Sequence, residues 1–175
     1  MRTRNVRIGP SNVREWSRRL HRDAAVLELA CGHGVVSQVL IEEGFAFYGI
    51  DASPTLLNAL RGRFPGANLE CALVEESDFF GRSFDAVVAW GLLFLLPAET
   101  QIAIIRKAAG ALDAGGRLMF TAPAIEHSWS DATTGQDSVS LGRTAYLRAI
   151  EDAGLTLDGE DSDLGNNHYY FARKT

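Results

Sequence analysis

The residues with the clearest chemical potential lie in and around a short glycine-containing turn. Glu28 precedes Gly32 and Gly34, and Asp51 follows a second apolar run further along the chain. Glycine lets the backbone adopt a positive φ and lets a ligand approach where a Cβ would collide. A helix that begins at the turn points its free N–H groups into it. This combination is typical of a nucleotide-binding site.

The two acidic side chains differ in what they are suited to bind. Asp51 ends the second apolar run, and its acceptor-only carboxylate has two oxygens spaced for the vicinal hydroxyls of a ribose. Glu28 lies closer to the turn and is suited to accept from an ammonium group or from loop amides. Neighbouring strands of a doubly wound sheet share one crevice at their carboxyl ends, where ligands bind. We therefore expect Glu28 and Asp51 to converge on one groove.

The elements that must position these side chains alternate between strands and helices. Apolar runs predict five strands, at 24–30, 45–50, 68–74, 84–90 and 117–121. Helical spacing predicts five helices, at 11–20, at 34–43, after the N-cap Ser53, from 97 until Gly115, and at 143–153. Strands that alternate with helices imply a parallel sheet with right-handed crossovers.

The last third of the chain departs from this alternation. Residues 122–140 show no clean period, which predicts a long loop of the kind that usually carries function. Residues 155–164 and 168–173 predict an antiparallel hairpin. In the helix that ends at Gly115, the predicted buried face is Ile102, Ile105, Ala109 and Leu112. The expected fold class is α/β, a doubly wound, mostly parallel seven-stranded sheet with a C-terminal antiparallel hairpin.

Composition narrows the classes of function. The chain has 175 residues and a net charge of −5, which argues against nucleic acid as the main ligand because phosphate binding needs a basic surface. We expect no membrane segment, since no apolar run approaches about 20 residues. No secretory signal is apparent, and the two cysteines form no disulfide framework, so we expect a cytoplasmic protein. The four histidines are scattered, and we expect no metal site.

Four segments of the chain, taken in order, carry a resemblance to a known family. They are Glu28-Leu29-Ala30-Cys31-Gly32-His33-Gly34, Asp51, Phe84-Asp85-Ala86-Val87-Val88 and Leu112-Asp113-Ala114-Gly115-Gly116-Arg117-Leu118. These segments resemble the glycine motif, the ribose-binding acid, the fourth-strand motif and the turn before strand five of class I S-adenosylmethionine-dependent methyltransferases. Two positions depart from the family pattern: Ala30 replaces its first glycine, and Ala114 stands where proline is common.

The resemblance implies a Rossmann-like methyltransferase fold and a role for each matched residue. It implies a single domain over 1–175, with an N-terminal arm and helix at 1–23 and a core at 24–175. S-adenosylmethionine is the implied cofactor and S-adenosylhomocysteine the product. The methionine end is implied to lie along Glu28, Ala30, Gly32, Gly34 and Ala89, the ribose on Asp51, and the adenine near Ala52, Val74, Glu75 and Glu76.

The acceptor is expected where strands four and five end, beneath the segment 122–140. His127 is a candidate base, because an imidazole can take a proton near neutral pH. Trp129 could stack on an aromatic acceptor or face a cation. Asp131 and Trp90 complete the candidate substrate contacts. The reaction implied by the resemblance is methyl transfer to a small-molecule acceptor of unknown identity, by a protein whose oligomeric state the sequence does not indicate.

Two other functions remain open from the sequence. Gly32-His33-Gly34-Val35-Val36-Ser37 is close to the dinucleotide-binding pattern, so an NAD(P)-linked oxidoreductase is one alternative. The second is a non-catalytic module that keeps the methyltransferase-like fold and acts through a protein partner. The short N-terminal segment favours this second alternative, because it offers little structure to cover an acceptor.

Overall fold

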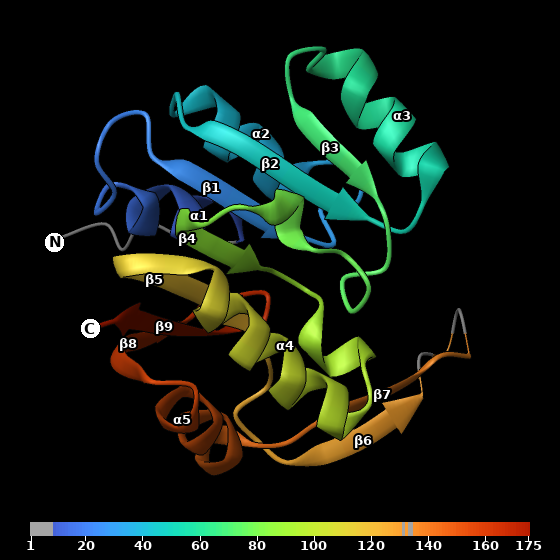
Figure 1. Cartoon of the computed structure of the whole chain (residues 1–175). Coiled ribbons are helices and arrows are strands. Elements are labelled where there is room, and N and C mark those ends of the chain that lie inside the picture. Colours follow the sequence, from blue (N-terminus) through green and yellow to red (C-terminus); the bar gives the residue numbers. More distant parts are fainter. Residues whose placement is uncertain (1–8, 131, 133–134) are drawn as a thin grey trace, which may run out of the picture.

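The computed structural model describes residues 9–130, 132 and 135–175, and its centre is a seven-stranded sheet (Figure 1). The strand order is β3-β2-β1-β4-β5-β9-β8. The first five run parallel, β9 runs antiparallel to β5, and β8 pairs antiparallel with β9. The strands are β1 (Ala25–Leu29), β2 (Ala46–Asp51), β3 (Asn68–Cys71), β4 (Phe84–Ala89), β5 (Leu112–Thr121), β8 (Leu155–Ser162) and β9 (His168–Lys174). The predicted fold class, including the C-terminal hairpin, is confirmed.

Helices cover both faces of the sheet. The α-helices are α1 (Pro10–Ser17), α2 (Val35–Glu42), α3 (Pro54–Arg63), α4 (Ala98–Ala111) and α5 (Arg143–Asp152), and short 3₁₀ turns are η1 (Phe79–Gly81) and η2 (Leu93–Leu95). Successive side chains of a strand point to opposite faces. Val26 accordingly packs with residues of α1, α2 and α3, whereas Leu27 packs with residues of α4 and α5. The result is a three-layer α/β/α arrangement with one apolar core on each face of the sheet.

The predicted buried face of α4 is correct except at Ile102. Ile105, Ala109 and Leu112 are buried as expected, whereas Ile102 is 37% exposed. The buried residues of α4 also include Gln101, Ile104 and Ala108, and Gln101 was missed because a polar residue occupies a core position. Gln101 tolerates complete burial because its side-chain amide has hydrogen-bond partners on both its nitrogen and its oxygen.

The segment 122–140 is more ordered than expected. It contains a two-stranded antiparallel sheet of β6 (His127–Ser130) and β7 (Asp137–Ser140), beyond the carboxyl ends of the parallel strands and alongside the start of α4 (Figure 1). The strands have four residues each and are rich in serine, so no apolar alternation marks them in the sequence. Predicted site residue Asp131 lies outside the described residues.

Other differences are at element boundaries. β3 ends at Cys71 rather than at residue 74, and β5 begins at Leu112 rather than at residue 117. The N-cap prediction is confirmed, since the Ser53 hydroxyl accepts a hydrogen bond from the Leu56 amide at 3.3 Å. Within the described parts of the chain, no helix has the length and apolar character needed to span a membrane.

Candidate functional site

The glycine turn connects β1 to α2 and lies beside the end of β2. Its backbone adopts a positive φ at Ala30, Gly32 and Gly34, at 54°, 53° and 90°. The Cys31 amide donates to the carbonyl oxygen of Ile50 at 3.0 Å, which extends the pairing of the two strands into the turn. The Ala30 conformation is costly for a residue with a Cβ, by about 1 kcal/mol or more. The turn therefore keeps a glycine-like geometry even where the sequence has alanine.

Gly32 and Gly34 are required for different reasons. A Cβ on Gly34 would lie 2.3 Å from Cδ1 of Leu60, so the packing of α3 against the turn favours glycine here. The positive φ of Gly34 favours glycine as well. A Cβ on Gly32 would meet no atom within 4 Å. Open space at Gly32 is what a ligand approaching the backbone needs, whereas Gly34 serves the packing of the turn itself.

Asp51 holds the turn in place through its carboxylate. Oδ2 accepts the Gly32 amide and Oδ1 accepts the Ser53 amide, each at 2.8 Å. A carboxylate has about four acceptor positions, and these two bonds leave about two for a ligand. Asp51 is only half-buried, so those positions can be reached from solvent. The arrangement fits a diol that binds beside the open face of Gly32.

Glu28 is buried beside α2. Its side chain is only 3% exposed and accepts a short hydrogen bond from the Ser37 hydroxyl of α2. Burial raises the pKa of Glu28 to about 8, the negative charge of Asp51 acts in the same direction, and the Ser37 bond opposes both. The carboxyl is therefore mostly protonated near neutral pH. Glu28 pairs with Gly49 of β2, two residues before Asp51, so the two acidic residues lie near the ends of neighbouring strands.

The residues predicted to contact adenine follow β2 and β3. Ala52, Glu75 and Glu76 are exposed, but Val74 is buried in the core. The carbonyl oxygens at 74 and 75 accept hydrogen bonds from Nζ of Lys107, both at 3.0 Å. The neighbouring Leu73 is 49% exposed and is the apolar surface available here. Sequence reasoning missed it because an apolar residue after a strand reads as part of the core.

The end of β4 lies in a fixed polar network. Ala89 is buried, and the half-buried Trp90 donates from Nε1 to the Tyr169 hydroxyl at 3.2 Å. Tyr169 in turn donates to Oδ2 of Asp163 at 2.7 Å, and the Gly9 amide donates to the same oxygen at 2.9 Å. The Asp163 carboxylate thus connects the start of α1 to the C-terminal hairpin, and Trp90 joins this network through Tyr169, a contact that the sequence did not reveal.

The predicted base His127 lies on β6. Its ring is exposed and stacks on Trp129, with centroids 4.5 Å apart and an interplanar angle of 20°. His127 Nδ1 is 3.2 Å from the carbonyl oxygen of Ile125. Trp129 also packs near Phe94 of η2, at 5.8 Å between centroids, and lines a cavity. The structure thus pairs the two predicted acceptor residues with each other, and the role of His127 as a base stays a prediction.

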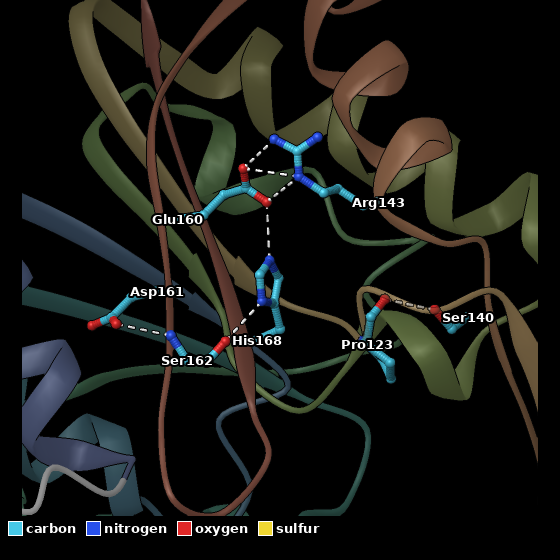
Figure 2. A network of polar contacts seen from close by, with 7 residues as sticks. All are labelled: Pro123, Ser140, Arg143, Glu160, Asp161, Ser162 and His168. Atoms are coloured by element: carbon cyan, nitrogen blue, oxygen red, sulfur yellow. Dashed lines mark hydrogen bonds and ion pairs between the residues drawn. The ribbon is translucent and has the colours of Figure 1, made fainter.

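A second polar network ties α5 to the C-terminal hairpin (Figure 2). Arg143 NH2 lies 2.6 Å from Oε2 of Glu160, and Nε2 of His168 lies 3.0 Å from the other carboxylate oxygen. The Ser162 hydroxyl lies 2.9 Å from Nδ1 of His168. Both ring nitrogens of His168 are therefore engaged, so this histidine is paired within the network. Among the residues that the structure describes, no group of three or more His, Cys, Asp or Glu side chains could hold a metal ion.

The strand order, the glycine turn and the paired acidic residues define the class I S-adenosylmethionine-dependent methyltransferase fold. Residues 26–116 match the family described as "Methyltransferase domain", and the chain belongs to that family. The resemblance noted from the sequence is therefore confirmed.

Individual relatives were also found. The chain is 30% identical over 169 residues to glycine N-methyltransferase of Mus musculus, covering 86% of this chain and 54% of the relative. The rabbit enzyme, from Oryctolagus cuniculus, is 34% identical over 171 residues, covering 86% of this chain and 55% of the relative. The chain thus spans about half the length of these curated relatives.

Solved structures share the fold at low sequence identity. The 1,6-didemethyltoxoflavin-N1-methyltransferase of Burkholderia thailandensis, solved with 1,6-didemethyltoxoflavin and S-adenosylhomocysteine, has a TM-score of 0.79 at 18% identity, over 95% of this chain and 78% of that one. An S-adenosylmethionine-dependent methyltransferase of Clostridium acetobutylicum has a TM-score of 0.78 at 12% identity. The match covers 94% of this chain and 90% of that one.

Proposed function

We propose that this protein transfers a methyl group from S-adenosylmethionine to a small-molecule acceptor. The observation that carries the proposal is the hydrogen bond between the Gly32 amide and Asp51, which joins the ends of β1 and β2 beside open space. Family membership supports the same reaction. The acceptor positions left on Asp51 suit the two ribose hydroxyls, and exposed Leu73 with Ala52 offers apolar surface for the adenine.

Glu28 would serve the amino acid end of the cofactor. Its carboxyl is neutral and hydrogen-bonded while the site is free of a charged partner. An ammonium group brought beside it favours the ionised form, because an opposite charge stabilises a carboxylate. Binding of the cofactor would therefore convert Glu28 from a buried acid to the anion that pairs with the ammonium.

The bound cofactor supplies a methyl group that its sulfonium already makes electrophilic. The protein then has to align the acceptor with this methyl group and exclude water, because correct orientation lowers the barrier to the reaction. Trp90, held by the Tyr169 hydroxyl at the end of β4, would form a fixed wall of this site. A base such as His127 is needed only for an acceptor that must lose a proton.

Calorimetry with S-adenosylhomocysteine tests the cofactor site. We expect binding that Asp51→Ala weakens by about 100-fold or more, since losing a hydrogen-bonded charged partner costs about 1.5–3 kcal/mol per bond. Glu151→Ala is the matched control, because Glu151 is exposed on α5, which packs on β8 and α4 far along the sheet from β2. Equal affinity of the Asp51 variant and the wild type would contradict the assignment.

The same assay separates the alternatives. Binding of NAD or NADP in preference to S-adenosylhomocysteine would favour the oxidoreductase. Tight binding of S-adenosylhomocysteine with no methylation across a broad acceptor screen would favour the non-catalytic module.

A further inference from the structure

A cavity of about 630 Å³ lies between the β6–β7 hairpin and the segment that leads into α4. One wall is formed by Leu95, the last residue of η2, and by Leu96 and Pro97, which lead into α4. The other wall consists of residues 128–130 of β6 and 137–139 of β7. Its volume falls in the range of sites that hold small organic ligands.

The two walls are held together by one buried side chain. Nε2 of Gln101 donates to the carbonyl oxygens of Leu96 and Val139, at 2.9 Å and 2.8 Å, so it joins both walls. Its Oε1 accepts the Tyr146 hydroxyl at 2.6 Å. The hairpin is fastened again where the Ser140 hydroxyl donates to the Pro123 carbonyl oxygen (Figure 2). The cavity is therefore preformed and does not depend on a ligand to bring its walls together.

An indole provides the aromatic surface of this cavity. Trp129 lines the cavity, and His127 is stacked on it with nearly parallel rings. Phe94 packs near the same indole from η2. The part of this supported indole that lines the cavity is a fixed aromatic surface, which favours planar aromatic ligands and cations.

The charge of the cavity excludes one class of ligand. Asp137 is among the lining residues, and its carboxylate accepts the Ser130 hydroxyl. Among the described residues that line the cavity, there is no lysine and no arginine, and Asp137 is the acidic one. A carboxylate or phosphate on the ligand would meet negative charge without a cation to pair with it.

We propose that this cavity binds the methyl acceptor and that the acceptor is a planar aromatic molecule that is neutral or carries a positive charge. The proposal rests on the proposed methyl transfer. It also separates this protein from the relatives named for glycine, because an amino acid carboxylate would have no cationic partner in the walls. Trp129 supplies the stacking face, and Asp137 accepts hydrogen bonds or pairs with the positive charge.

The test measures binding of four naphthalene-sized probes by calorimetry, with S-adenosylhomocysteine measured separately. The probes are 2-naphthol, the cation of 2-(aminomethyl)naphthalene, the 2-naphthoate anion and saturated decahydro-2-naphthol. We expect the amine and the naphthol to bind, and the naphthoate and the saturated alcohol to bind about tenfold more weakly or not at all. Trp129→Leu should weaken binding of the amine and of the naphthol about tenfold, and Trp129→Phe should retain most of the wild-type affinity.

A second variant tests whether the Asp137 carboxylate causes the preference for a cationic ligand over an anionic one. Asp137→Asn keeps the size of the side chain and should narrow the difference in affinity between the amine and the naphthoate. The control Asp152→Asn, at an exposed position on α5, should leave that difference in affinity unchanged. Naphthoate binding as tight as that of the amine would overturn the proposal. So would equal binding of the saturated alcohol and naphthol, or binding of S-adenosylhomocysteine but of no ring compound. Binding of the amine without any binding of S-adenosylhomocysteine would instead overturn the proposed methyl transfer.

Discussion

Nε2 of Gln101 lies 2.8 Å from the carbonyl oxygen of Val139, and this bond joins the first turn of α4 to the β6–β7 hairpin. Because the side chain is fully buried and also bonds Leu96 and Tyr146, water cannot easily replace it. A single polar residue in the core thus holds a surface hairpin in position over the end of the sheet. The candidate acceptor cavity depends on that bond.

Gln101→Leu should therefore both destabilise the fold and loosen the hairpin. The change removes the side-chain donor to two carbonyl oxygens and the acceptor of the Tyr146 hydroxyl proton, for a loss of about 2–4 kcal/mol in the free energy of unfolding. Urea denaturation measures the loss, and limited proteolysis within 122–142 should become faster. The exposed Gln38→Leu on α2 is the control and should change stability by about 0.5 kcal/mol or less. Equal proteolysis of the two variants would contradict this role of Gln101.

Ala30→Gly should stabilise the protein. Ala30 adopts a φ of 54°, a conformation in which a Cβ is crowded and glycine is not. The expected gain is about 0.5–1 kcal/mol, measured by urea denaturation without ligand. Ala122→Gly provides the comparison, since Ala122 is a buried alanine outside the positive-φ positions of the described chain and should lose about 1 kcal/mol. A loss of stability in both variants would show that the strain at Ala30 is negligible.

Binding of S-adenosylhomocysteine should release a proton from Glu28. The free protein holds this carboxyl protonated below its pKa of about 8, because burial disfavours the anion. If the ligand's ammonium pairs with Glu28, the pKa falls and the proton leaves at pH values near 7. The calorimetric binding enthalpy should then vary with the ionisation enthalpy of the buffer, and that variation should vanish in Glu28→Gln. A buffer-independent enthalpy in the wild type would show that Glu28 does not meet the ammonium.

Asp163 should contribute stability that is lost in acid. Burial alone would raise the pKa of Asp163, but hydrogen bonds from Gly9, Asn167 and Tyr169 outweigh it and lower the pKa to about 2. A carboxyl with a lowered folded-state pKa stabilises the fold above its ordinary value of about 4, and that stability disappears as the pH falls towards about 2. The unfolding free energy should therefore drop less between pH 5 and pH 3 in Asp163→Asn than in the wild type.

The control for this prediction is Asp152→Asn on α5, whose pH profile should parallel that of the wild type. If the Asp163 variant also follows the wild type, the contact between the Gly9 amide and the turn of the β8–β9 hairpin does not depend on the charge.

Much of the core architecture could be predicted from the sequence. The apolar runs at 24–30, 45–50 and 84–90 match β1, β2 and β4 to within about one residue at each end. Their side chains are buried on both faces of the sheet, which makes such strands continuous in hydrophobicity and easy to recognise. The glycine turn and Asp51 were recognisable for the same reason, since they follow directly from those strands.

The predictions failed where polar residues serve the interior. The buried Gln101 was missed on α4 while the exposed Ile102 was predicted to be buried, and the serine-rich strands β6 and β7 were taken for a loop. In both places a hydrogen bond made across a long stretch of sequence stabilises a residue that apolar periodicity cannot identify. Leu73 and Val74 show the same limit, because only the packing decides which of two adjacent apolar side chains is covered.

The sequence by itself determined the order of strands and helices, the glycine turn and the family, because these follow from local preferences and from the periodicity of apolar residues. Only the tertiary structure decided that Glu28 is a buried, neutral acid, that Asp51 holds the turn, and that Trp129 faces a preformed cavity. Ionisation and accessibility depend on the groups that pack against a side chain from distant parts of the chain. The neighbouring residues in the sequence do not indicate which groups these are.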